Sequence, residues 1–323
     1  MTGGSGVVGR AVVERLLGRG DDVVALARSP DAAVALEGLG ARVARGDLLD
    51  GDVLARGMDG CDVVFHVAGV NTHCVDDPTP MLRTNVDGPP AVVKAAALAG
   101  VRRVVHTSSA ATIGEPEGEV GREDTAHRGW FLSTYERSKT EGERAALEAG
   151  RNEGVEVVCV NPSSVQGPGR SGGTARILLA FLDGRLKVFI DTNVSLVDIR
   201  DCATGHLLAA ERGVPGERYI LNGVTMSVPE VLNLVSEVEG IDRRPRLVPG
   251  AAATFAAAVV ERAFRLVRRQ PPVCREMMRT IIHGHRYDGS RAERELGLRY
   301  TDPRDTVRRT IAWAREAGLL RRS

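Results

Sequence analysis

A glycine-rich stretch at the start of the chain constrains the fold more than any other feature. Gly3, Gly6 and Gly9 recur at every third residue and lead into the helical pattern of residues 10–17. Glycines at this spacing allow a tight turn, a close backbone approach to a pyrophosphate and close packing of a helix on a sheet. The free N–H groups of that helix would face the phosphates. We therefore predict a dinucleotide-binding loop with contacts from Gly3, Ser5, Gly6, Val7, Val8 and Gly9.

The strand that should deliver the chain into this loop is almost missing. Only Met1 and Thr2 precede Gly3, although a dinucleotide fold needs a buried strand at this point. We expect the first strand to be truncated, and a strand of several apolar residues to belong upstream.

Residues 1–161 alternate between short apolar strands and helices. Several of the strand segments are almost continuous in Val and Ala, as in strands buried on both faces of a parallel sheet. The pattern predicts an α/β fold with a doubly wound parallel (Rossmann) sheet. We expect strands at 23–27, 41–44, 62–68, 103–107 and 155–160, and helices at 91–99 and 133–149.

Residues 162–323 have longer, glycine-containing connections, amphipathic helices and a few isolated strands. We predict that they form mainly a smaller C-terminal α/β lobe that binds substrate, with some segments returning to the Rossmann sheet. Ligands of such sheets bind at the carboxyl ends of the strands. Residues 251–269 are apolar first and then basic, for which a lid or core helix is favoured over a helix on a membrane surface.

The overall composition indicates a small-molecule partner. Lys and Arg number 43 and Asp and Glu 42, so no global field attracts nucleic acid or an anionic membrane. The longest apolar run, residues 251–260, is too short to span a bilayer. No leader pattern opens the chain, and the five cysteines have no CxxC spacing. We expect a cytoplasmic protein with reduced, packed cysteines.

The histidines do not indicate a metal site. His66, His106 and His206 lie in strand or helix patterns and are expected in the core. His283 and His285 resemble a metal-binding pair, but no third ligand with suitable spacing is near them in the sequence. We predict no metal.

The residue after the strand expected at 23–27 bears on the choice of dinucleotide. NAD-binding folds place an acidic residue there to bind the ribose 2′-hydroxyl, whereas this chain has Arg28. A guanidinium can hold a 2′-phosphate, so NADP(H) is favoured over NAD(H). The alternative is that Arg28 is a solvated surface residue before a helix capped by Ser29.

Asp47, followed by Leu48, comes after the third strand. Its carboxylate can accept a hydrogen bond from adenine or simply cap a helix.

A second pair of residues suggests proton transfer. Tyr135 and Lys139 are four residues apart and share one helix face. Proton exchange by a phenol near pH 7 needs its pKa lowered by roughly 3 units, or about 4 kcal/mol. One cation about 4 Å away supplies about 4 kcal/mol at an effective dielectric near 20.

Ser108 and Ser109 end the strand at 103–107, where a hydroxyl can hold a substrate oxygen or cap the backbone.

Taken together, these motifs resemble the extended short-chain dehydrogenase/reductases, also called the NAD-dependent epimerase/dehydratase family. The glycine loop, the Ser108-Ser109 pair, the Tyr135/Lys139 pair, Asn85 within RTNVDG, and NPSS at residues 161–164 carry the resemblance. Residues 197–203 and 217–221 extend it into the second lobe. Residues 66–68 and 167–169 are similar to the branch of dihydroflavonol reductase-like proteins and hopanoid-associated sugar epimerases.

The resemblance implies roles for individual residues. Tyr135 would be the acid/base, and Lys139 would lower its pKa and bind the nicotinamide ribose. Ser109 would orient the substrate, with Ser108 as the fallback, and Asn85 would lie near the proton path. Further cofactor contacts are implied for Val67, Ala68, Ser108, Pro162 and Ser163. In this family a homodimer through the helices near Ala91 and Tyr135 is expected.

Three reactions remain open at this stage. The favoured one is hydride transfer between NADP(H) and a carbonyl or secondary alcohol. A nucleotide-sugar epimerase would use the same residues with tightly held NAD, which Arg28 disfavours. A dehydratase needs an Asp-Glu pair after the active-site serine, where Ala110-Ala111 stand. A non-catalytic dinucleotide sensor is disfavoured because Tyr135 and Lys139 are both present.

Overall fold

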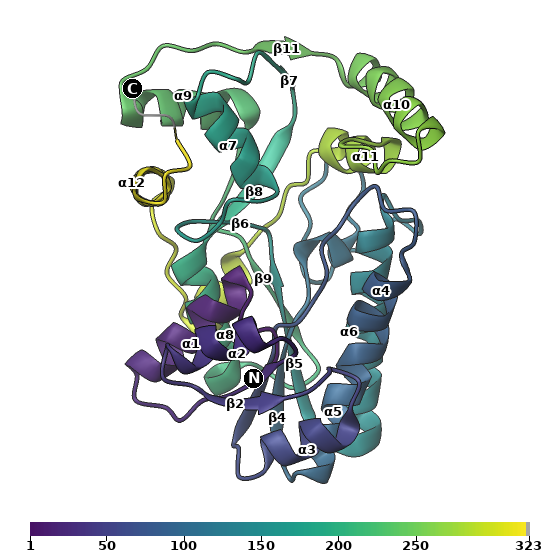
Figure 1. The fold of residues 1–323 in the computed structure, drawn as a ribbon, viewed down its shortest axis with the longest axis vertical. Helices are drawn as coiled ribbons and strands as arrows, with labels where there is room; N and C mark the ends of the chain where they lie inside the picture. The colour runs from purple at the N-terminus through teal and green to yellow at the C-terminus, as the bar shows by residue number, and fades with distance from the viewer. Residues whose placement is uncertain (321–323) are drawn as a thin grey trace.

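The computed structural model describes residues 1–320 and shows an α/β fold with two lobes (Figure 1). Four parallel strands form the centre of the larger lobe in the order β3-β4-β5-β9, and β1 and β2 form a parallel pair. Their bounds are β1 (Val24–Ala27), β2 (Arg42–Arg45), β3 (Val63–His66), β4 (Arg103–Thr107), β5 (Glu156–Pro162) and β9 (Arg218–Leu221). The prediction of a doubly wound Rossmann sheet is confirmed.

Met1 and Thr2 occupy the place between β1 and β3. Leu26 N donates to Met1 O at 2.8 Å, and Thr2 N donates to Phe65 O at 3.0 Å. Thr2 forms a parallel bridge with His66. Met1 and Thr2 therefore connect the β1–β2 pair to the rest of the sheet.

Helices cover both faces of this sheet because neighbouring strand residues point in opposite directions. Val105 of β4 packs in a core with α1 and α8, whereas Val104 packs with α3, α5 and α6. The helices of this lobe are α1 (Val7–Gly18), α2 (Pro30–Glu37), α3 (Gly51–Met58), α4 (Thr79–Leu82), η1 (Arg83–Asp87), α5 (Gly88–Leu98), η2 (Ala110–Ile113), α6 (Thr134–Glu153) and α8 (Ile199–Arg212).

The smaller lobe lies beyond the carboxyl ends of β4 and β5 (Figure 1). It contains a three-stranded sheet in the order β10-β8-β6 and a parallel pair of β11 and β7. The strands are β6 (Ser164–Gln166), β7 (Val188–Ile190), β8 (Asn193–Asp198), β10 (Val224–Ser227) and β11 (Arg246–Val248). The helices are α7 (Thr174–Leu182), α9 (Val228–Glu239), α10 (Gly250–Leu266), α11 (Arg275–His283) and α12 (Pro303–Glu316). The short η3 (Ala292–Leu296) belongs to the larger lobe, because Ala292 and Leu296 pack in the same core as α1 and α8.

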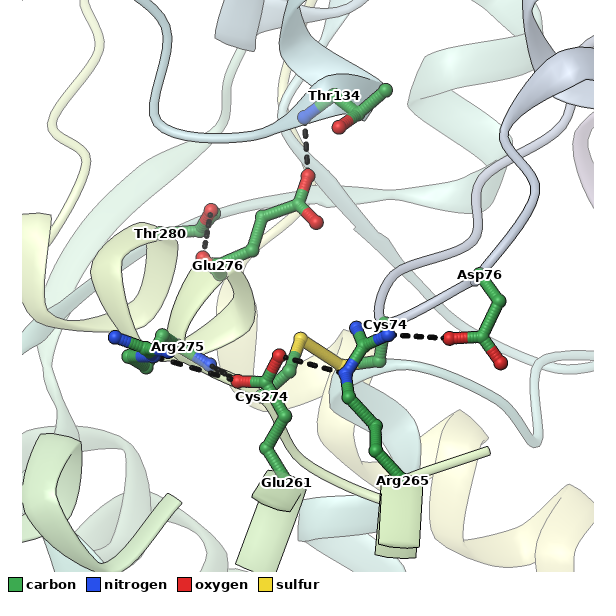
Figure 2. Close-up of a disulfide and its surroundings, with 9 residues drawn as sticks. All are labelled: Cys74, Asp76, Thr134, Glu261, Arg265, Cys274, Arg275, Glu276 and Thr280. Carbon is green, nitrogen blue, oxygen red and sulfur yellow. Dashed lines mark hydrogen bonds and ion pairs between the residues drawn. A yellow bond between two sulfur atoms is a disulfide. The ribbon is translucent and has the colours of Figure 1, made fainter. Parts of the chain in front are cut away.

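A disulfide corrects the expectation that every cysteine is reduced. Cys74, in the loop after β3, is bonded to Cys274 at the start of α11 (Figure 2). Cys159 and Cys202 are buried free thiols, as expected, and Cys61 is half-buried. The sequence did not indicate the bond because 200 residues separate its cysteines. None of the helices within residues 1–320 combines the length and apolar character that a bilayer span requires.

Candidate active site

The glycine loop forms a cradle that side chains would fill. A Cβ on Gly3 would lie 2.4 Å from the Ala68 backbone nitrogen, and one on Gly9 would lie 2.0 Å from the Gly3 carbonyl oxygen. Gly6 precedes α1 without a side-chain cap, and the first turn of α1 has no acidic residue. The backbone N–H groups at this end of α1 are thus available to an anion. These features fit the pyrophosphate of a dinucleotide.

A cavity of about 1770 Å³ begins at this loop and continues into the smaller lobe. Typical single-ligand pockets measure about 300–1,000 Å³, so the cavity has room for a dinucleotide and a substrate together. Apart from Asn85, every site residue predicted from the sequence lines it: Gly3, Ser5, Gly6, Val7, Val8, Gly9, Arg28, Asp47, Leu48, Val67, Ala68, Ser108, Ser109, Tyr135, Lys139, Pro162 and Ser163.

Arg28 and Asp47 lie where the strands β1 and β2 end. Both side chains are exposed and line the cavity. The Ser29 hydroxyl caps α2 by accepting a hydrogen bond from Ala32 N at 3.2 Å, so the cap does not require the neighbouring Arg28 side chain. The Asp47 carboxylate accepts from Leu49 N at 3.0 Å, so part of its role is to shape the turn.

Tyr135 lies in the first turn of α6, which Ser133 caps by accepting from Glu136 N at 3.1 Å. Burial raises the pKa of the Tyr135 phenol, while a hydrogen bond with Ser109 and the charge of Arg170 act to lower it. Arg170 also lines the cavity. Sequence reasoning missed this residue and considered only the charge of Lys139 beside the phenol.

Lys139 is buried one turn after Tyr135, with 4% of the residue exposed. Its Nζ donates to the Thr107 carbonyl oxygen at 2.7 Å, at the end of β4. Burial lowers the pKa of Lys139 to about 8, although the carboxylate of Glu143 acts to raise it. The ammonium is therefore held at a fixed position beside the cavity.

Asn85 is buried in η1 and holds a loop rather than facing the cavity. Its Oδ1 accepts from Val70 N at 2.8 Å, and its Nδ2 donates to Val70 O and Ser138 Oγ, each at 2.9 Å. Ser138 in turn donates to the Tyr135 carbonyl oxygen at 2.7 Å. Asn85 thus connects the loop after β3 to the turn of α6 that contains Tyr135.

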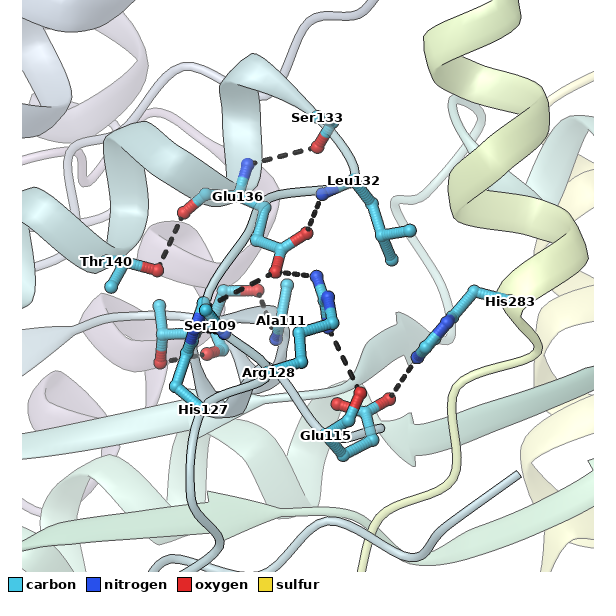
Figure 3. Close-up of polar contacts among 12 residues, drawn as sticks. Ser109, Ala111, Glu115, His127, Arg128, Leu132, Ser133, Glu136, Thr140 and His283 are labelled. Carbon is cyan, nitrogen blue, oxygen red and sulfur yellow. Dashed lines mark hydrogen bonds and ion pairs between the residues drawn. The ribbon is translucent and has the colours of Figure 1, made fainter. Parts of the chain in front are cut away.

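A buried polar network lies behind the start of α6 (Figure 3). Arg128 makes an ion pair with Glu136 and donates to the Glu115 carbonyl oxygen at 3.2 Å. Burial acts to raise the pKa of Glu115, but hydrogen bonds from His283 and His285 outweigh it, and the pKa falls to about 2. The network joins Glu115 of the larger lobe to the segment that follows α11.

This network overturns one step of the sequence argument about metals. The sequence showed no third ligand for His283 and His285, but the fold brings Glu115 to them, with possible ligand atoms within 4.8 Å of one another. Glu115 Oε1 lies 2.6 Å from His285 Nδ1 and 3.3 Å from His283 Nε2. The shorter distance is that of a hydrogen bond, so we assign a carboxylate that accepts from the His285 imidazole and propose no metal.

The three histidines that were expected in the core lie there. His66, His106 and His206 are each at most 1% exposed. Burial lowers the pKa of His66 to about 3 and that of His206 to about 4, so both stay neutral near pH 7.

Comparison with known proteins gives the family. Residues 1–221 match the NAD dependent epimerase/dehydratase family. The chain is 34% identical to a protein named sterol demethylase protein B from Methylococcus capsulatus, over 99% of both proteins. It is 33% identical to a putative dihydroflavonol 4-reductase from Synechocystis sp., over 99% of this chain and 95% of that protein.

Solved structures agree with this assignment. The crystal structure of a nucleoside-diphosphate-sugar epimerase from Pseudomonas aeruginosa superposes with a TM-score of 0.78 at 25% identity, over 99% of this chain and 97% of that chain. The glycine cradle, the cavity at the carboxyl ends of the strands and these similarities lead to one conclusion. This chain is an enzyme of the NAD-dependent epimerase/dehydratase family, of the extended short-chain dehydrogenase/reductase type.

Proposed function

We propose that this enzyme interconverts a carbonyl and a secondary alcohol on a small organic substrate, with NADP(H) as cofactor and Tyr135 as acid/base. The observation that carries the proposal is that Ser109, Tyr135 and Lys139 all line the cavity that begins at the glycine loop. The buried ammonium of Lys139 lies on the same helix face, one turn away.

Each of these groups has a distinct task in the proposed reaction. The bound dinucleotide supplies or accepts the hydride. The Ser109 hydroxyl orients the substrate oxygen, and Tyr135 Oη gives a proton to that oxygen in reduction or takes it in oxidation. Lys139, fixed by the Thr107 carbonyl, binds the cofactor ribose. Asn85 is a positioning residue, because its contacts are with the loop at Val70 and with Ser138.

Arg28 supports NADP(H) over NAD(H). No ion pair involves this exposed guanidinium within residues 1–320, and it lines the cavity at the end of β1. A 2′-phosphate would give it an anionic partner. We expect Arg28→Ala to weaken NADPH binding by at least tenfold and to leave NADH binding within about twofold, as measured by fluorescence titration. Equal losses for both cofactors would contradict the preference.

Turnover tests the proposal directly. The protein is incubated with NADPH and panels of ketones and aldehydes, and loss of the near-ultraviolet NADPH band is followed. We expect Tyr135→Phe to lower kcat by about 10²–10⁴-fold with NADPH affinity retained. Full turnover by this variant would refute the assignment of Tyr135.

An NAD-dependent nucleotide-sugar epimerase is the second candidate. It is favoured by the family description and by the similarity to a nucleoside-diphosphate-sugar epimerase. Extraction of copurified cofactor followed by mass spectrometry separates the two. Tightly bound NAD together with isomerisation of a sugar nucleotide would establish the epimerase. A third possibility, a dinucleotide sensor, predicts cofactor binding without turnover of either substrate class.

A further inference from the structure

The smaller lobe exposes an apolar helix face. Phe255, Val259 and Leu266 of α10 are 73%, 55% and 81% exposed. Their spacing of four and seven residues places them on one side of the helix. Ala257 is the buried residue of α10. The sequence favoured a lid or core helix here, but α10 lies at the edge of the molecule (Figure 1).

The exposed apolar surface continues beyond α10. Val267 directly follows the helix and is 65% exposed. β11 leads into α10 at the same end of the molecule (Figure 1), and Val248 packs in the same cluster as Ala257. We call Phe255, Val259, Leu266 and Val267 the α10 face. A set of neighbouring exposed apolar side chains marks an interaction surface.

Charge at the C-terminal end of the α10 face is positive. Between residues 261 and 276 the chain has five arginines and two glutamates, while the whole chain has a net charge of +1. Ion pairs within this stretch involve Arg265 and Arg275. Arg262, Arg268 and Arg269 are exposed, and no ion pair is found for them within residues 1–320. The balanced charge of the chain therefore conceals a local basic surface.

Contacts on the inner side of α10 hold the helix with this face outward (Figure 2). Arg265 makes an ion pair with Asp76 at 2.5 Å, and Glu261 accepts from Arg275 N at 3.0 Å. The Cys74–Cys274 disulfide joins the start of α11 to the same loop as Asp76. The apolar residues are thus displayed on an anchored element rather than on a loose segment.

We propose that the α10 face binds the surface of an anionic lipid bilayer. An apolar helix stripe flanked by arginines is the composition of a helix that lies in the membrane interface, and clustered arginines are attracted to anionic headgroups. Nucleic acid would use the arginines but has no need for the aliphatic stripe. Met277, Thr280 and Ile281 of the adjoining α11 line the cavity, so docking places one cavity wall close to the membrane.

Vesicle flotation of the full chain tests this proposal without reference to the reaction. Vesicles of phosphatidylcholine alone are compared with vesicles that also contain phosphatidylglycerol. We expect binding to the anionic vesicles that weakens as salt is raised. Leu266→Ser is expected to weaken it by at least tenfold. Leu98→Ser is the matched control, because Leu98 at the end of α5 is also 81% exposed, and it should bind like the unmodified chain.

A second variant separates charge from apolar contact. Arg268→Gln/Arg269→Gln should reduce binding to anionic vesicles and flatten its salt dependence, and thermal unfolding confirms that each variant is folded. No vesicle binding, or equal binding by Leu266→Ser and Leu98→Ser, would overturn the proposal. It would also be overturned by a dimer that Leu266→Ser dissociates, or by DNA binding that this variant retains.

Discussion

Cys74 and Cys274 are covalently joined across 200 residues of sequence, and the bond ties a loop of the larger lobe to the start of α11 in the smaller one. His73, next to the first cysteine, lines the cavity and contacts the ring of Tyr135 edge-on at 5.8 Å between centroids. Pro272 and Val273 line the cavity beside the second. The disulfide therefore holds two walls of the proposed substrate site together.

Removing this bond should destabilise the chain. A cross-link between distant residues restricts the unfolded chain, and disulfides typically contribute about 2–4 kcal/mol. We expect Cys74→Ser/Cys274→Ser to lower the free energy of unfolding by about this amount and to raise KM more than it lowers kcat. Cys61→Ser, which alters a free thiol, is the control. Thiol titration that finds five free thiols in the folded, unreduced protein would show that the bond does not form.

The hydrogen bond between Ser109 and Tyr135 predicts a change in pH profile. This bond acts to lower the pKa of the phenol, so Ser109→Ala should raise the pH at which the phenol ionises. We expect kcat to fall by about 10²-fold and the acidic limb of the oxidation profile, which reports ionisation of the phenol that acts as base, to move to higher pH. Ser108→Ala should have the smaller effect, since no hydrogen bond to Ser108 Oγ is found in residues 1–320. The opposite ranking would assign the substrate-orienting role to Ser108.

The buried ammonium of Lys139 should lower the free energy of unfolding at neutral pH. Its pKa is lowered by burial from 10.5 to about 8, so between these values the unfolded chain binds the extra proton and stability rises with pH. Each pKa unit corresponds to about 1.4 kcal/mol, so below pH 8 the free energy of unfolding is lower by about 3 kcal/mol. We expect Lys139→Met to be inactive but more stable by up to this amount near pH 7, with the difference shrinking as pH approaches 10.5. Denaturant unfolding at several pH values measures it, and a pH-independent difference would contradict the burial of a charged Lys139.

The two ends of α1 provide a matched test of the glycine cradle. A Cβ on Gly9 would meet the Gly3 carbonyl oxygen at 2.0 Å, whereas a Cβ on Gly18 meets nothing within 4 Å. Gly9→Ala should therefore weaken dinucleotide binding by at least tenfold and lower stability by about 1–3 kcal/mol. Gly18→Ala should retain binding and raise stability by up to about 1 kcal/mol. Calorimetric titration and thermal unfolding give both quantities, and unchanged binding by Gly9→Ala would exclude this cradle as the cofactor site.

Local sequence was sufficient to predict much of the sheet. The Val- and Ala-rich runs became β1, β3, β4 and β5, with every bound within two residues of the predicted one. The helix expected at 91–99 begins three residues earlier, at Gly88, and Pro89 and Pro90 lie in the first turn of α5. Proline is tolerated there because those N–H groups have no helical partner. The predicted site residues other than Asn85 line one cavity because loops at the carboxyl ends of parallel strands converge.

By itself the sequence determined the alternation of strands and helices, the glycine turn before α1, and the shared helix face of Tyr135 and Lys139. Each of these depends on backbone preferences and on side chains within a few positions of one another. Tertiary structure alone decided that Arg170 acts on the Tyr135 phenol, that Glu115 meets His283 and His285, and that Cys74 meets Cys274. It also decided that α10 turns its apolar stripe outward, because helical periodicity defines an apolar face but not whether protein or solvent lies against it.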